Sequence, residues 1–249
     1  MKKRIRLSVI FSMMLLVTIG VAAQPSPAFQ AATNAVQGKI TTASITETNP
    51  LPIDPALKCL PASGKIVVCA LLRPGQYHMY YREGVRGHTQ TAAMGGFPWV
   101  FEPIDTRTKF GTKAKTSDRL CQFLGLDMVE RRDTIVYLEV DVKDLFRPSY
   151  ESSPNLPVNF IASHQYTLSS TDPVIINWFH REIGSNTSPW TRMGYTYDWG
   201  PGANTSHTGA TEFILKRGST YKCVDQGGTD NWVGGNRKRY YKVVSDYLK

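Results

Sequence analysis

Residues 211–224 read TEFILKRGSTYKCV, and this stretch indicates the class of fold. Two runs rich in aromatic and aliphatic residues lie on either side of an Arg-Gly pair at positions 217 and 218. Such runs favour β-strands, and a glycine-containing pair between them is typical of a hairpin turn. The stretch therefore predicts two adjacent antiparallel strands.

Similar runs recur along the chain between clusters of glycine, proline and asparagine, which is the usual sequence pattern of short strands. Further strands are predicted at 65–72, 76–81, 97–104, 134–142, 159–168 and 239–248. Strands outnumber helices, and the two do not alternate regularly. The pattern predicts an α+β fold, mainly antiparallel β-sheet with about two helices.

The two predicted helices are identified by their end signals. Residues 117–126 have Ser117 as a candidate N-cap and Gly125 near the exit. Residues 171–184 have Asp172 as a cap, followed by a proline at the first helical position. His180 lies in the last turn of this second helix, where we interpret it as a capping or surface residue.

The first 23 residues have the pattern of a secretory signal peptide. A basic head precedes a short apolar run, and small residues lead up to Ala23. A single membrane anchor is the alternative, but Thr18 and Gly20 interrupt a run that is already short for a bilayer span. We expect a bacterial protein exported to the periplasm or secreted, with no membrane span after signal removal. Residues 24–56 are predicted to be a flexible leader and 57–249 a single β-rich domain.

Basic residues concentrate at the C-terminal end of the chain. Loss of residues 1–23 would lower the formal net charge from +9 to about +5, and residues 216–249 alone carry +5. A candidate polyanion-binding cluster comprises Arg237, Lys238, Arg239 and Tyr240. The alternative is an edge strand kept from aggregating by its charges. Export makes nucleic acid an unlikely partner.

Four cysteines, Cys59, Cys69, Cys121 and Cys223, follow the predicted signal peptide. An even number in an oxidising compartment predicts two disulfides, with three possible connectivities. Cys59 and Cys69 flank a Pro-Ala-Ser-Gly turn, which favours a local bridge and leaves the other two to pair. No cysteine pair has the spacing of a zinc knuckle, so we expect no structural metal. No cofactor motif is present either, so no cofactor is expected.

Residues 194–207, GYTYDWGPGANTSH, form the strongest candidate ligand site. As a strand, this stretch puts Tyr195, Tyr197 and Trp199 on one face. Rings with polar rims suit a glycan or another polar ligand, and Asn204 lies in the glycine-rich loop that follows. The alternative is a core strand followed by a wide turn.

Candidate acid/base residues are Glu212 with Asp198, His164 or His207. His164 lies on a predicted strand, and Glu212 begins the strand that follows the candidate ligand loop. Their proximity is an assumption about the fold. Arg82 and Arg86, among glycines, are candidates for holding an anionic part of a ligand.

Three functions are compatible with these features. The first is an exported binding or interaction protein that uses the 194–207 loop on an envelope or host ligand, and that has a possible role in virulence. The second is a secreted, toxin-like hydrolase or group-transfer enzyme. The third is a structural envelope component in which all candidate sites are packing. Common catalytic motifs such as Gly-x-Ser-x-Gly and HExxH are missing, which places the binding protein first.

Overall fold

The computed structural model describes residues 24–43, 51–73, 75–81, 91–158, 168–185, 187–224 and 241–243. Several predictions concern residues outside these ranges. They are the signal peptide, most of the predicted strand 159–168, His164, Arg82, Arg86 and the basic cluster Arg237, Lys238, Arg239 and Tyr240.

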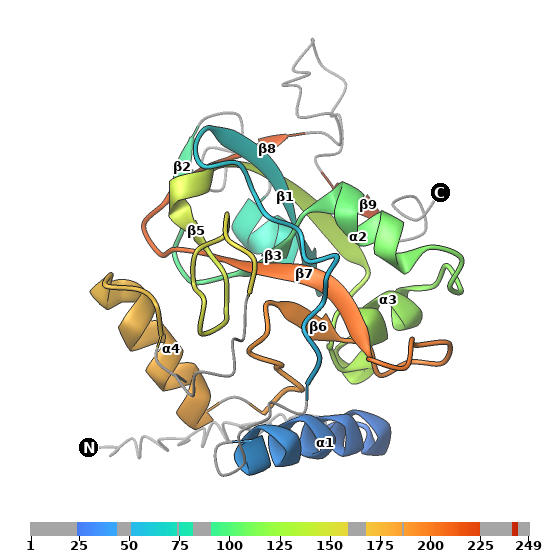
Figure 1. The fold of residues 1–249 in the computed structure, drawn as a ribbon. Helices are drawn as coiled ribbons and strands as arrows, with labels where there is room; N and C mark the ends of the chain where they lie inside the picture. The colour runs from blue at the N-terminus through green and yellow to red at the C-terminus, as the bar shows by residue number, and fades with distance from the viewer. Residues whose placement is uncertain are drawn as a thin grey trace, which may run out of the picture.

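The described residues form a nine-stranded antiparallel sheet with four α-helices, so the α+β prediction is confirmed (Figure 1). The strands are β1 Lys65–Leu72, β2 Ala92–Ala93, β3 Trp99–Phe101, β4 Thr134–Asp141, β5 Leu145–Phe146, β6 Tyr195–Tyr197, β7 Thr208–Leu215, β8 Thr220–Val224 and β9 Tyr241–Val243. Their order is β2-β8-β4-β1-β3-β7-β5, with β6 paired to β7 and β9 paired to β4.

The α-helices are α1 Pro27–Ala43, α2 Pro103–Phe110, α3 Ser117–Phe123 and α4 Pro173–Ser185. Short helical turns cover Tyr77–Tyr81, Met128–Glu130 and Val142–Asp144. Within the described part of the chain, no helix has the length and apolar character needed to cross a membrane.

The hairpin predicted at 211–224 is wrong, although its turn forms. Ser219 N donates to Lys216 O across the turn, and Gly218 adopts a φ of 85° that suits glycine. The two strands nevertheless pair elsewhere: β7 with β3, β5 and β6, and β8 with β2 and β4. A tight turn reverses the direction of the chain, but it does not require the two strands that it joins to pair with each other. Here other strands pair with both edges of β7 and of β8.

The sheet curves around an apolar core, here called the inner core. Phe213 of β7 and Cys223 of β8 both lie in this core, although three strands separate β7 from β8 in the sheet. Alternate residues of β1 follow the same rule, since Val68 and Ala70 face the inner core. The intervening Cys69 faces the opposite side, which α2 and α3 cover with Phe110, Leu120 and Phe123.

Helix α1 lies within the segment expected to be a flexible leader. Its buried Ala32 and Val36 pack with Met193 and with Tyr195 of β6. Full burial of such an aliphatic side chain contributes roughly 1.5–3 kcal/mol, which a composition rich in Ala, Thr and Gln does not reveal. Residues 27–43 therefore form a packed helix within the predicted leader, because a distant strand supplies the apolar surface against which they pack.

The two predicted helices are confirmed as α3 and α4. Thr116, rather than Ser117, caps α3 by accepting a bond from Arg119 N. Asp172 caps α4 through Val174 N. The strand predicted at 76–81 is wrong, because these residues are helical. The strand predicted at 97–104 is wrong in part, because this range contains only the short β3 before α2 begins at Pro103. Glu102 caps α2, and proline is favourable at its first position.

The predicted disulfides are absent, since all four cysteines are free thiols. Cys59 is exposed in a loop, whereas Cys69 is fully buried under α2 and α3. Cys121 lies on that same helix-covered side, while Cys223 faces the inner core. The sheet therefore separates Cys121 from Cys223, and burial of Cys69 separates it from the exposed Cys59. Burial raises the pKa of Cys69 and raises that of Cys223 to about 12, so these thiols stay protonated.

Candidate functional site

The aromatic residues of the 194–207 stretch are mostly covered. Tyr195 is fully buried, and its hydroxyl donates to Pro52 O at 2.9 Å. Trp199 is half-buried and meets Phe29 of α1 edge to face, with ring centroids 6.0 Å apart. The three aromatic residues share one cluster, but α1 packs against it. They form no open aromatic platform.

Both carboxylate oxygens of Asp198 have partners within the protein. Its carboxylate is fully buried and lies 2.7 Å from an Arg119 guanidinium nitrogen of α3, which is itself only 3 % exposed. The other carboxylate oxygen accepts a hydrogen bond from Gly200 N at 3.1 Å. A buried charge is tolerated when it is paired in this way. Asp198 therefore joins the loop to α3 and has no open side for a ligand.

His207 and Asn204 stabilise the same loop. The His207 ring stacks on Tyr197 at 4.8 Å, and its Nδ1 lies 2.7 Å from Asp198 O. Asn204 bonds to Thr208 through both its amide nitrogen and its amide oxygen. These contacts account for His207 and Asn204 as turn-forming groups.

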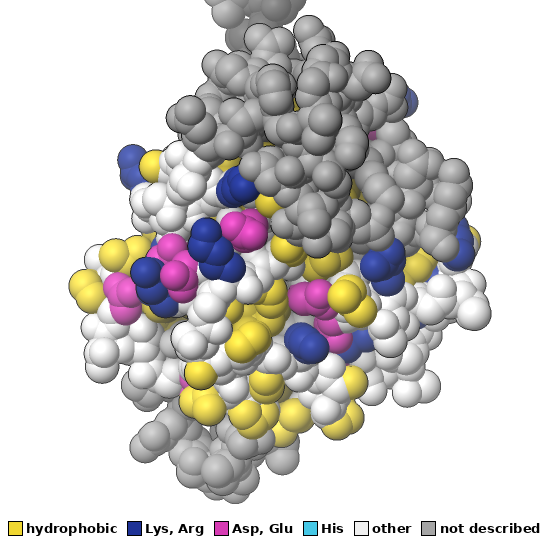
Figure 2. Space-filling view, turned by 90° about the horizontal axis from the view of Figure 1, so that it is seen from above, with side chains coloured by type: hydrophobic (Ala, Val, Ile, Leu, Met, Phe, Trp, Pro, Cys, Tyr) yellow, Lys and Arg dark blue, Asp and Glu magenta, His cyan; other side chains and the backbone are white. Residues whose placement is uncertain are grey.

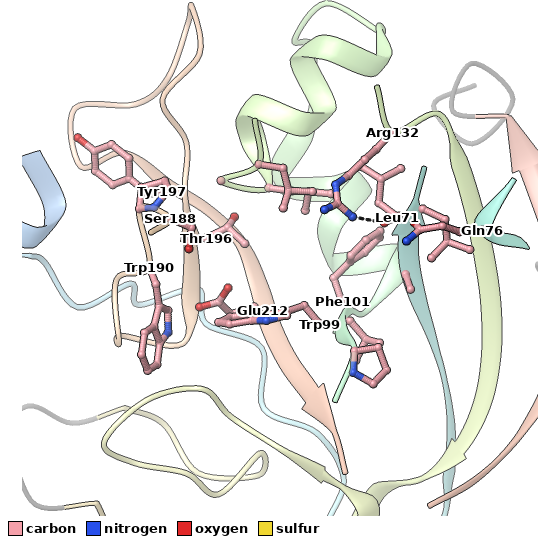
Figure 3. Close-up of a pocket in the computed structure, with 18 of the residues that line it drawn as sticks. Leu71, Gln76, Trp99, Phe101, Arg132, Ser188, Trp190, Thr196, Tyr197 and Glu212 are labelled. Carbon is pink, nitrogen blue, oxygen red and sulfur yellow. Dashed lines mark hydrogen bonds between the residues drawn. The ribbon is translucent and has the colours of Figure 1, made fainter. Parts of the chain in front are cut away.

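A cavity of about 430 Å³ lies beside this loop, between one face of the sheet and residues 188–197 (Figure 3). Its size matches sites for small organic ligands. Most of the lining is apolar and aromatic. The lining includes Leu71, Trp99, Phe101, Leu124, Leu126, Trp190, Thr196 and Tyr197, together with Gln76, Arg132 and Glu212.

Glu212 reaches the cavity because of its position in β7. The pleat places Phe213 and Leu215 in the inner core, so Glu212 points to the opposite face, where it lies across from Phe101 of β3. Glu212 is 6 % exposed, and its buried Oε1 has no hydrogen-bond partner among the described residues. In the described part of the chain, no ion pair includes this carboxyl group. An unsatisfied buried acid of this kind costs free energy unless something binds it.

Burial raises the pKa of Glu212 from its ordinary 4.5 to about 8, and the positive charge of Arg147 opposes part of this rise. Arg147 is itself fully buried. It donates to the carbonyl oxygens of Lys58, Pro154 and Leu156 at 3.1–3.3 Å. These carbonyls, rather than Glu212, hold Arg147 in place. At pH 7 Glu212 is thus mostly a neutral acid that can donate a hydrogen bond into the cavity.

Aromatic side chains are held rigidly next to Glu212. The Trp190 indole nitrogen donates to Pro148 O at 2.8 Å, and its ring meets Trp99 edge to face at 6.0 Å. Figure 3 shows Glu212 near Trp190 and Thr196, with Arg132 and Gln76 across the cavity. Arg132 donates to Leu71 O at 3.3 Å. The site combines one neutral acid, one cation and flat apolar walls.

Of the predicted site residues, the structure brings Glu212 and Tyr197 to one cavity. Tyr197 contributes less to this cavity than Glu212 does, because the Tyr197 ring stacks on His207. Asp198, His207, Asn204 and Tyr195 serve packing. Sequence reasoning missed Trp99, Trp190 and Arg132. Trp99 lay in a predicted strand. No local sequence signal indicated Trp190 or Arg132, because their position at the cavity depends on which strands pair.

Charged side chains outside the cavity do not form a large field of one sign on the face in Figure 2, where basic and acidic groups of the described residues lie side by side. Exposed pairs such as Lys65–Glu139, 3.3 Å apart, are typical of a solvated surface. Among the described residues, no group of three or more His, Cys, Asp or Glu side chains is placed to hold a metal ion.

Comparison of the chain with protein-family models, curated proteins and solved structures finds no match.

Proposed function

We propose that the protein binds a small, mainly apolar organic molecule in the cavity beside Glu212. The observation that carries this proposal is the buried Oε1 of Glu212, which has no hydrogen-bond partner among the described residues and lies at a rigid aromatic wall. Protein interiors seldom leave such a group unsatisfied, and binding sites are where this happens. The volume of about 430 Å³ suits a ligand with one or two rings.

The ligand proposed here is smaller and less polar than the glycan predicted from residues 194–207. A glycan needs many hydrogen-bonding partners, and the lining offers few beside Glu212, Arg132 and Gln76. The signal-peptide pattern of residues 1–23 supports binding outside the cytoplasm, in the periplasm or after secretion.

A second candidate function is acid/base catalysis by Glu212. A pKa of about 8 supports this role, because a group that titrates near neutral pH can both donate and accept a proton. Of the predicted acid/base residues, Asp198 and His207 are engaged in the loop, so Glu212 would act without them. No nucleophile is assigned, and binding therefore remains the first proposal.

Indole is a suitable probe for the cavity, because it is flat, neutral and small. We expect saturable binding of indole to the purified full chain, measured by saturation-transfer NMR and by a rise in thermal midpoint. Leu126→Trp should fill the cavity and abolish this binding. Val129→Trp is the matched control, since Val129 is 41 % exposed and lies outside the lining. Equal indole binding by both variants would reject the cavity as the site.

A further inference from the structure

Glu212 and the aromatic residues around it also indicate the chemical class of the ligand, if the proposed binding function holds. Glu212 is 6 % exposed, and its Oε1 has no hydrogen-bond partner within the described part of the chain. Trp99, Phe101 and Trp190 line the cavity with it. The group that such a site lacks is a hydrogen-bond donor that is also attracted to aromatic rings.

An ammonium group has both properties. It carries three N–H donors and a positive charge, so it can form a charge-assisted bond to a carboxylate. The negative faces of indole and phenyl rings attract cations, and removal of water strengthens the attraction. A neutral donor would satisfy Oε1 but would lack the attraction between a cation and the rings.

We propose that the cavity binds an organic amine as its cation, with Glu212 as the carboxylate that pairs with it and with Trp99 and Trp190 beside the charge. The amine's hydrocarbon or aromatic part would lie along Leu71, Phe101 and Leu126. Binding forms one ammonium–carboxylate pair, and the proton of Glu212 leaves to solvent.

Proton release is the signature of this arrangement, because Glu212 is mostly protonated before the amine enters. The other charged or titratable groups facing it are Arg147 behind β7, Tyr195 and Tyr197 on β6, and Arg132 across the cavity. Arg147 keeps its charge at pH 7, as its pKa is about 10. Burial raises the pKa of both tyrosines, which stay neutral. Glu212 is therefore the group in this set that changes charge between pH 6 and 8.

Four probes that share one ring test the proposal: indole, tryptamine, indole-3-acetate and tryptophan. For the wild-type chain at pH 7 we expect tryptamine to bind at least about tenfold more tightly than indole, by isothermal titration calorimetry. Titration in two buffers of different ionisation enthalpy should show release of close to one proton per tryptamine and none for indole. Tryptamine affinity should rise from pH 6 to pH 8.

Two variants distinguish a specific ion pair from nonspecific binding of tryptamine. Glu212→Gln, checked for folding by near-UV circular dichroism, should lose the preference for tryptamine. Glu139→Gln is the matched control, because Glu139 is paired with Lys65 at the surface and should keep the preference. The two-buffer measurement uses only the wild type, so it decides the question even where Glu212→Gln does not fold.

The outcomes distinguish this inference from the binding function beneath it. Indole binding without a gain for tryptamine, or without proton release, overturns the amine and leaves the cavity as a binding site. Tighter binding of indole-3-acetate would assign the cavity to anions at Arg132 and also overturn the amine. Absence of saturable binding by every probe rejects the binding function itself.

Discussion

Two buried acids lie at the ends of the same short region of chain, and their surroundings differ. Asp198 has Arg119 at 2.7 Å and a backbone donor at Gly200. Among the described residues, the buried Oε1 of Glu212 has no hydrogen-bond partner, and Glu212 faces a cavity instead. Asp198 is satisfied within the protein, whereas Glu212 can be satisfied only by something that enters the cavity. Burial alone therefore does not identify a functional acid, and the decisive feature is whether the fold supplies a partner.

The largest expected effect comes from removing the satisfied acid. Asp198→Ala leaves the Arg119 charge buried without its partner, and such a loss typically costs about 3–5 kcal/mol of unfolding free energy. Urea denaturation measures this loss. Asp118→Ala is the control, because Asp118 is exposed on the same helix and should change stability by less than about 1 kcal/mol. Similar losses for both variants would mean that the Asp198–Arg119 pair contributes no more to the unfolding free energy than an exposed acid does.

The unsatisfied acid should appear in the pH dependence of stability. Its pKa is raised from 4.5 to about 8 by burial, so the folded state keeps a proton that the unfolded state has released. This contribution is fully present below about pH 4.5 and is lost as the pH rises toward 8, by roughly 1.4 kcal/mol per pH unit.

We therefore expect the unfolding free energy of the wild type to fall more steeply between pH 5 and pH 8 than that of Glu212→Gln, which has no proton to release. Urea titrations at several pH values give both slopes. Parallel slopes would show that Glu212 is ionised in the folded protein, and the contrast with Asp198 would disappear.

A smaller effect tests how closely the loop around Asp198 packs on α3. A Cβ added at Gly200 would lie 2.7 Å from an Arg119 guanidinium nitrogen and even closer to the side-chain oxygen of Gln122. Gly200→Ala should therefore cost about 1–3 kcal/mol by crowding the ion pair. Gly96→Ala is the control, since a Cβ there meets nothing within 4 Å. Thermal unfolding of both variants measures the difference. Equal midpoints would mean that the loop shifts to accommodate the added Cβ without loss of stability.

Local patterns predicted much of the secondary structure. Runs of β-branched and aromatic residues predicted β1, β4 and β7, and end signals predicted α3 and α4, because strand propensity and helix capping depend on residues close in sequence. The predictions failed where distant partners decide. The turn at Lys216–Ser219 formed, yet its strands joined different neighbours, and α1 folded because β6 covers it. The disulfides failed for the same reason, since the sheet places Cys121 and Cys223 on opposite faces.

By itself the sequence determined that Glu212 belongs to a strand whose next residue, Phe213, points the other way. Strand geometry alone fixes that alternation. Only the tertiary structure decided which acid is paired: Arg119 reaches Asp198 from 79 residues away, and Trp99 and Trp190 reach the cavity of Glu212 from separate segments. Such contacts depend on strand order and helix packing, which many residues set together and no short stretch encodes.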